Sequence, residues 1–109
     1  MKCYISTKEV EKSVGKGVID YPLLDETNGC VAGCCTGITI YATTEYTPNT
    51  HDDQEGFLII EGEGWALVGE EEFRIEEETS FIVPAGVIHA IKRHPDSKPV
   101  KVFWFHAAI

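Results

Sequence analysis

Apolar and polar residues alternate through much of the chain after residue 36, in short stretches separated by Gly and Pro. Residues 37–46 are rich in β-branched and aromatic side chains, and Ile38, Ile40 and Ala42 alternate there with Thr and Tyr. A period of two residues is typical of a strand that buries one of its faces. After residue 20 the sequence has no sustained helical period with caps, so the pattern predicts strands.

The same reasoning predicts six further strands, each bounded by turn-forming residues such as Glu61-Gly62-Glu63-Gly64. Their expected ranges are 56–60, 65–68, 72–75, 81–83, 87–91 and 100–107. Short strands at regular spacing with Gly or Pro turns are typical of β-barrels and jelly rolls. The sequence therefore predicts an all-β fold.

The first 35 residues have a weaker pattern and predict an N-terminal arm. Residues 1–20 alternate poorly, and residues 18–24 are apolar but interrupted by Pro22, which favours an edge strand or a linker. Residues 25–29 form a cluster of turn residues. A chain of 109 residues fits one domain. We expect an arm with edge strands over residues 1–35 and a barrel over residues 36–107.

Composition and charge limit the partners. Lys and Arg total 9 against 18 Asp and Glu, a formal net charge of −9 that repels nucleic-acid phosphates. The sequence has no apolar run long enough to span a bilayer, and its first residues lack the apolar core of a secretory signal. We expect no nucleic-acid or membrane partner and a cytoplasmic location.

The chain has four cysteines: Cys3, Cys30, Cys34 and Cys35. In a reducing cytosol they are expected to be free thiols. The last three can also be interpreted as a metal or redox cluster, but the paired Cys-x-x-Cys spacing of such sites is missing. We favour the interpretation that they are small buried apolar side chains beside a strand.

Residues 49–62 resemble the first motif of the cupin superfamily. That motif reads His-x-His, three or four residues, Glu, six residues and Gly. Here His51 matches the second His, Glu55 follows after three residues and Gly62 after six more. Asn49 stands at the position of the first His.

Residues 78–93 resemble the second cupin motif, which reads Gly, five residues, Pro-x-Gly, two residues, His, three residues and Asn. Pro84, Gly86 and His89 match it, whereas Glu78 and Arg93 stand at the Gly and Asn positions. The resemblance extends over residues 36–107. It implies a double-stranded β-helix, the jelly-roll barrel of cupins.

The resemblance also implies that His51, Glu55 and His89 bind a divalent metal ion. On an extended strand His51, Asp53 and Glu55 leave the same face, although a bulge would turn Asp53 aside. Closure of the sheet then brings His89 beside them. Two imidazoles and a carboxylate suit Fe(II), Mn, Ni or Zn and leave coordination positions open. Asn49, through its amide oxygen, or Asp53 is a candidate further ligand.

The last predicted strand has two different faces. Lys101 should face water, so Phe103 and Phe105 share its outward face. Trp104 and His106 then line the cavity, and His106 becomes a candidate catalytic base or a group beside the metal ligands. A strand-end histidine at the barrel rim is an equally good interpretation. The two phenylalanines need cover from a second sheet or another subunit, which favours a homodimer.

Three functions remain open at this point. The resemblance implies a family of dioxygenases, isomerases, epimerases, decarboxylases and lyases, hence a metal-dependent enzyme acting on a carbonyl, carboxylate or sugar-type molecule. A module that binds such a molecule without turnover is the second function. A structural protein with a degenerate metal site is the third. Asn49 argues against enzymes that need three histidines, and the substrate is not predicted because one fold hosts many chemistries.

Overall fold

The computed structural model describes residues 1–107; the last two residues of the predicted domain lie outside this range. The described chain contains nine strands and one 3-10 turn. They are, in order, β1 (Ser13–Gly15), β2 (Val18–Pro22), η1 (Glu26–Asn28), β3 (Cys35–Tyr41), β4 (Glu55–Glu61), β5 (Gly64–Val68), β6 (Glu71–Ile75), β7 (Ser80–Val83), β8 (His89–Arg93) and β9 (Val100–His106). Within the described residues, no helix is long and apolar enough to cross a membrane.

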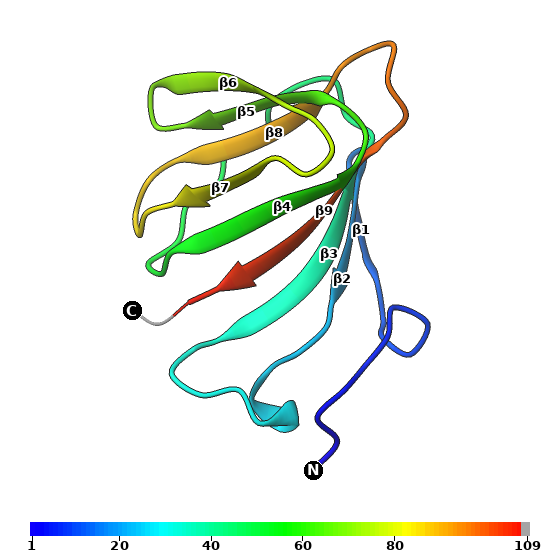
Figure 1. Ribbon diagram of the computed structural model, residues 1–109, viewed down its shortest axis with the longest axis vertical. Coiled ribbons are helices and arrows are strands. Elements are labelled where there is room, and N and C mark those ends of the chain that lie inside the picture. The colour runs from blue at the N-terminus through cyan, green and yellow to red at the C-terminus, as the bar shows by residue number, and fades with distance from the viewer. Residues whose placement is uncertain (108–109) are drawn as a thin grey trace.

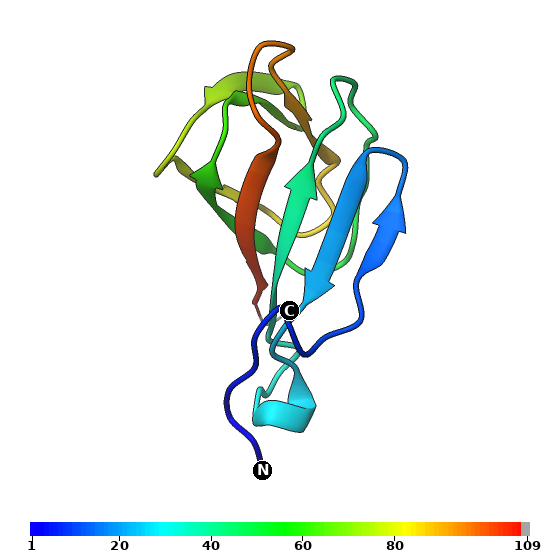
Figure 2. The same ribbon diagram turned by 90° about the vertical axis from the view of Figure 1, so that its right-hand side faces the viewer.

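The strands form two antiparallel sheets that curve toward each other (Figure 1). The larger sheet has the order β1-β2-β3-β9-β4-β7, and the smaller sheet has the order β6-β5-β8. Figure 2 shows the larger sheet from the side of β1 and β2, with β9, β3, β2 and β1 side by side. The last described strand, β9, lies between β3 and β4 in the middle of the larger sheet. The predicted all-β fold is confirmed.

The hydrophobic core fills one end of the space between the sheets. Its buried members are Phe57, Ile59, Ala66, Ile75, Val83, Ile91, Val100 and Val102. On β9 the alternation expected from the sequence holds, because Val100 and Val102 are fully buried and Lys101 between them is not. Ile59 lies opposite Val102 and Glu55 lies opposite His106. The core therefore occupies one end of β4 and β9, and polar residues occupy the other end.

The N-terminal arm contributes two strands to the larger sheet. β2 pairs with the whole of β3, from Val18 opposite Tyr41 to Pro22 opposite Gly37, and β1 pairs with β2. Pro22 is the last residue of its strand, where its missing N–H is tolerated. The chain departs from β3 after Tyr41, earlier than predicted, because the Ala42 N–H donates to the Gly17 carbonyl at 2.8 Å.

Two other expectations need correction. The strand predicted at residues 87–91 runs instead from His89 to Arg93, because the turn that begins at Pro84 is followed by two residues, 87 and 88, that belong to no strand. The cysteines are free thiols, but they are not buried side chains. Cys3 and Cys34 are exposed, and Cys30 and Cys35 are partly exposed.

The two departures from the second motif have different structural consequences. Glu78, at the usual Gly position, adopts a left-handed backbone with φ 69°, which costs a non-glycine residue about 1 kcal/mol. Arg93, at the usual Asn position, donates hydrogen bonds to the carbonyl oxygens of Ala42 at 2.9 Å and Ser97 at 2.8 Å. Arg93 thereby ties the β8–β9 loop to the segment after β3.

Candidate metal site

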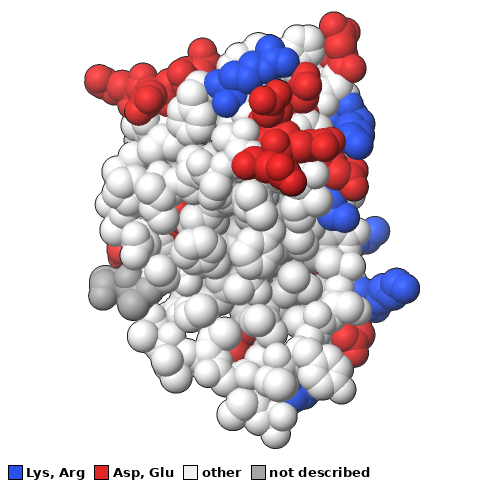
Figure 3. Space-filling view, in the orientation of Figure 1, with Lys and Arg blue, Asp and Glu red and all other residues white. Residues whose placement is uncertain are grey.

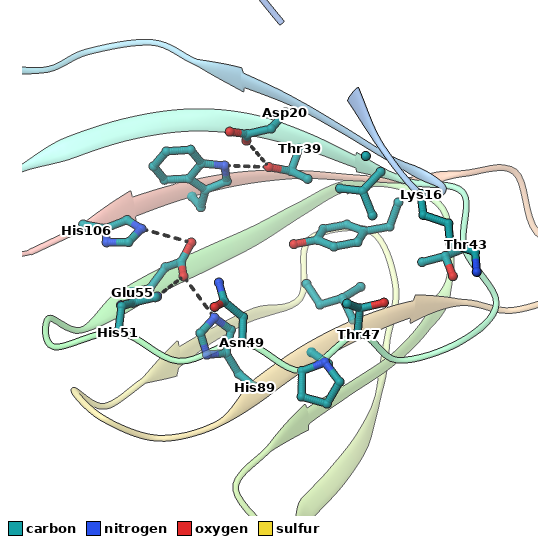
Figure 4. A pocket seen from close by; sticks show the side chains of 17 residues that line it. Lys16, Asp20, Thr39, Thr43, Thr47, Asn49, His51, Glu55, His89 and His106 are labelled. Atoms are coloured by element: carbon teal, nitrogen blue, oxygen red, sulfur yellow. Dashed lines mark hydrogen bonds and ion pairs between the residues drawn. The ribbon is translucent and has the colours of Figure 1, made fainter. Parts of the chain in front are cut away.

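Three histidines and two acids gather at the polar end of the barrel. Figure 4 shows the three histidines around one of these acids, Glu55. His51 and Asp53 come from the loop before β4, and Glu55 is the first residue of β4. His89 begins β8, and His106 ends β9. Two sheets and one loop therefore supply the cluster.

Backbone pairing brings these distant residues together. Glu55 lies directly opposite His106 in the larger sheet. Asn49 forms an isolated antiparallel bridge with His89, in which the N–H of each residue donates to the carbonyl of the other at 2.9 Å. This bridge attaches the loop before β4 to the smaller sheet. It therefore holds the start of the first motif beside the histidine of the second motif.

Residues 51–54 do not form the extended strand that the parity argument assumed. β4 begins at Glu55, and the chain bends at residues 52–53. The Gly86 N–H donates to the His51 carbonyl at 2.8 Å and holds this loop against the turn after β7. The bend does not turn Asp53 out of the cluster, because its carboxylate contacts the His51 ring.

All three imidazole rings direct Nε2 toward the carboxylate of Glu55. The distances to Oε1 are 2.8 Å from His51 and 3.2 Å from His89. The distance from His106 Nε2 to Oε2 is 3.4 Å. The Glu55 side chain is only 9% exposed, so these rings replace most of the water around its charge.

The opposite nitrogens of the rings contact protein acceptors. The Asp53 carboxylate lies 2.7 Å from His51 Nδ1 and 2.9 Å from His106 Nδ1. His89 Nδ1 lies 3.2 Å from the Val87 carbonyl oxygen. Each Nδ1 therefore has an acceptor for its hydrogen, and each Nε2 faces Glu55.

The charges in the cluster shift the pKa values of its members. Burial favours the neutral form of Glu55, but hydrogen bonds from His89 and His51 outweigh it and lower the pKa of this carboxyl. Burial also opposes the charge of Asp53, but contacts with His106 and His51 lower its pKa. Burial favours neutral His51, yet the Glu55 carboxylate and then Asp53 raise the pKa of this imidazole.

The donor atoms suit a divalent transition metal ion. His51, Glu55 and His89 each offer a ligand atom within 4.8 Å of the others, and so do His51, Asp53 and His106. Imidazole nitrogens and carboxylate oxygens are ligands for Fe(II), Mn, Ni and Zn. A neutral Nε2 and a carboxylate repel each other at 2.8 Å unless a proton or a cation lies between them. The arrangement therefore fits a metal ion.

A cavity of about 620 Å³ opens beside the cluster. Trp104 and His106 line it, as the alternation along the last strand predicted, and so does Tyr41. The Trp104 ring lies against Gly37, where a Cβ atom would be 2.2 Å from the ring. Gly37 therefore leaves the space that the indole occupies. Figure 4 shows Lys16, Thr43 and Thr47 at the end of the cavity away from the histidines.

The sequence did not identify one polar group in the cavity wall. The buried Thr39 hydroxyl accepts a hydrogen bond from Trp104 Nε1 at 2.8 Å and donates one to Asp20 at 2.6 Å. Thr39 lies two residues before Tyr41 and therefore on the same face of the strand, which was the sequence signal that could have placed it in the cavity wall. Asp20 and Lys16 lay in the weakly patterned arm, where no signal pointed to the cavity.

Comparison with known proteins agrees with this geometry. A sequence model described as "Cupin domain" matches residues 38–106. No curated protein matches the chain. The structure is similar to that of FeII HppE, with a TM-score of 0.81, 16% identity, and 95% of this chain and 59% of the HppE chain covered. The chain thus spans less than two thirds of the length of HppE.

Two further solved structures share the fold. An RmlC-like cupin from Shewanella frigidimarina NCIMB 400 has a TM-score of 0.77 at 15% identity, covering 100% of this chain and 93% of that one. The polyketide cyclase RemF from Streptomyces resistomycificus has a TM-score of 0.80 at 13% identity, covering 97% and 79%. The predicted jelly-roll fold is confirmed. The match over residues 38–106 shows that the chain belongs to the cupin family.

Proposed function

We propose that this protein binds a divalent metal ion through His51, Glu55 and His89 and binds a small carbonyl, carboxylate or sugar-type molecule in the adjoining cavity. The observation that carries the proposal is the convergence of imidazole Nε2 atoms on the buried Glu55 carboxylate, at 2.8 Å from His51 and 3.2 Å from His89. Fe, Mn, Ni and Zn all suit these donors. Iron is the first metal to test, because the similar HppE structure is that of its FeII form.

The cavity supports the small-molecule part of the proposal. A bound ion would supply Lewis acidity toward an oxygen atom of the ligand. The protein itself supplies apolar walls from Ile91 and Trp104 and a polar group from Thr39, which together orient a ligand. Lys16 lies at the far end, where its ammonium group favours a ligand with a second, anionic group (Figure 4). HppE, which shares the fold, has likewise been solved with an alternative substrate, (S)-1-HPP.

Protein purified without chelator and without nickel affinity resin is expected to contain about one metal ion per chain. Removing the ion should lower the melting temperature, because an ion that binds only the folded state adds about 4 kcal/mol at a free concentration 1,000 times its Kd. Elemental analysis and thermal unfolding before and after chelation measure both effects.

His51→Ala and His89→Ala should each lose the ion, and His94→Ala is the matched control. His94 stacks on Trp65 with ring centroids 5.1 Å apart and lies outside the cluster. Retention of the ion by both cluster variants contradicts the proposal. Turnover of keto acids and other carbonyl compounds by the loaded protein, under air and under argon, then separates an enzyme from a binding module.

A homodimer is the second part of the proposal, because the outer face of the larger sheet is apolar. Its exposed residues include Leu58 at 42%, Ile60 at 39%, Ile82 at 49% and Phe105 at 39%. Figure 3 shows this face nearly free of charge beneath a rim of charged side chains. A contiguous apolar face of this kind is typical of a protein interface. We propose that the same face of a second copy covers it.

Replacing Leu58 by Glu is expected to convert the dimer to a monomer, because the carboxylate would be buried without a partner in the interface. Light scattering coupled to size-exclusion chromatography measures the mass. Ile88→Glu is the matched control, since Ile88 is 53% exposed but lies outside the strands of this face. A wild-type protein that elutes as a monomer at high micromolar concentration contradicts this part of the proposal.

We also place the protein in the cytoplasm. The four cysteines are free thiols, and Cys3 and Cys34 are exposed. A reducing compartment keeps such thiols reduced. Fractionation of the source cells, followed by thiol labelling, tests this location.

A further inference from the structure

We propose that His106 is the third imidazole ligand of the metal ion, in the place of the motif histidine that Asn49 replaces, and that Asp53 orients both His51 and His106 for this purpose. The inference rests on the proposed metal site and adds to it a ligand from another strand. It also changes the role of His106 from a proton-transferring base to a metal ligand.

The orientation of the His106 ring is the first observation. Both carboxylate oxygens of Asp53 lie 2.9 Å from its Nδ1, so this nitrogen carries the hydrogen and donates it. The lone pair of Nε2 then points toward Glu55, whose Oε2 is 3.4 Å away. A histidine held this way, with a carboxylate on one nitrogen, is prepared to bind a metal through the other.

The three rings of the cluster share this arrangement. His51 also directs Nδ1 to Asp53, at 2.7 Å, and His89 directs Nδ1 to the Val87 carbonyl, at 3.2 Å. The Nε2 atoms of all three face the one carboxylate of Glu55. His106 therefore resembles the two motif histidines in that its Nδ1 has a protein acceptor and its Nε2 faces Glu55.

The distances match those between ligands of one ion. Ligand atoms about 2.1 Å from a metal ion lie about 3.0 Å apart at right angles and about 3.4 Å apart at tetrahedral angles. The separations of Nε2 from the nearer Glu55 oxygen are 2.8 Å for His51, 3.2 Å for His89 and 3.4 Å for His106. All three lie in or within a few tenths of an ångström of that range. Each ring therefore lies close enough to Glu55 to share an ion with it, and the proposal requires the His106 side chain to move toward the group of His51, Glu55 and His89.

Asn49 is less suited to be the additional ligand. Its side-chain oxygen accepts the Thr50 N–H at 2.9 Å, and its backbone is paired with His89. An amide oxygen is also a weaker ligand than an imidazole for the later transition metals. His106 lies opposite Glu55 in the sheet, so β9 supplies the imidazole that is missing at position 49.

A second ion between His51, Asp53 and His106 is the competing arrangement, because these residues form a second candidate group. It would require the ion to displace the Nδ1 hydrogens that now occupy the contacts with Asp53, at 2.7 Å and 2.9 Å. The proposal instead assigns Asp53 to hydrogen bonding and predicts one ion per chain.

The test compares Zn(II) affinity by competition with a coloured chelator for full-length variants. His106→Gln is expected to weaken binding at least about 100-fold, and Asp53→Asn about 10- to 100-fold through loss of ring orientation. Asn49→Ala and the matched control His94→Gln should stay within about threefold of wild type. Circular dichroism and melting of the metal-free variants establish that each one folds.

Spectroscopy of the Cu(II)-loaded protein supplies a readout that a structural role would not change. Pulsed EPR should count three coordinated imidazoles in the wild type, two in His106→Gln and three in Asn49→Ala. Wild-type affinity and three imidazoles in His106→Gln, or two ions per wild-type chain, overturn the inference. If His51→Ala and His89→Ala still lose the ion in that case, the proposed function stands. A wild type that binds no ion overturns both.

Discussion

Replacing Glu55 by Gln is expected to weaken metal binding by at least about 100-fold, equivalent to about 3 kcal/mol. Gln keeps the size of the side chain but removes the charge that a divalent ion needs in a site where the carboxylate is 9% exposed. It also presents N–H groups toward the imidazole Nε2 atoms, which then accept hydrogen bonds and no longer share an ion. Titration with Zn(II) and elemental analysis measure the loss.

The matched control is Glu61→Gln on the same strand. Glu61 is exposed, and its carboxylate lies 3.7 Å from Lys98 Nζ. It is the last residue of β4, at the opposite end of the strand from Glu55. A surface pair of this kind contributes less than about 1 kcal/mol, so metal binding should be unchanged. Equal affinity of Glu55→Gln and wild type would show that the ion binds elsewhere.

Metal-induced stabilisation is expected to grow from pH 5.5 to pH 8.5, while the metal-free protein loses stability over part of the same range. The pKa of His51 is raised above its ordinary 6.5. Its protonation therefore stabilises the metal-free fold fully below pH 6.5, and this contribution disappears as the pH rises through the raised pKa. The pKa values of Glu55 and Asp53 are lowered from 4.5 and 3.8, so their contribution is present above those values and disappears in more acidic solution.

The ion has the opposite dependence, because it must displace the His51 proton. Its affinity should rise about tenfold per pH unit for one displaced proton until His51 is neutral. Melting curves at half-unit pH steps, with a chelator and with saturating Zn(II), measure both trends. A metal-induced shift in melting temperature that stays constant from pH 5.5 to pH 8.5 contradicts the assignment of His51 as a ligand.

The local patterns of the sequence predicted the strands that have one buried face. Val100 and Val102 alternate with Lys101, and this alternation alone indicated which face of β9 is inside. The N-terminal strands were predicted poorly because β1 is wholly exposed and β2 is at most partly buried, so neither shows the alternation of a buried face. Their position in the sheet depends on backbone pairing with β3, which no single stretch of sequence reveals.

The histidine and acid positions of the two motifs indicated the site, but not its full membership. Asp53 and His106 are 53 residues apart, and their contact depends on the register that places Glu55 opposite His106. A shift of that register by one residue would move the His106 ring to the outer face. The alternation in the sequence predicted that His106 points inward, whereas its contact with Asp53 became visible only from the pairing of the strands.

The central place of β9 in the larger sheet has a consequence for synthesis of the protein. β3 and β4 have no contact through pairing until residues 100–106 are inserted between them. On a ribosome, the earlier strands must therefore wait for nearly the whole described chain to emerge before the sheet can close. Such long-range closure is slow, and it leaves the edges of β3 and β4 open to other chains in the meantime. Because His106 travels on the inserted strand, the complete imidazole set forms only after that insertion.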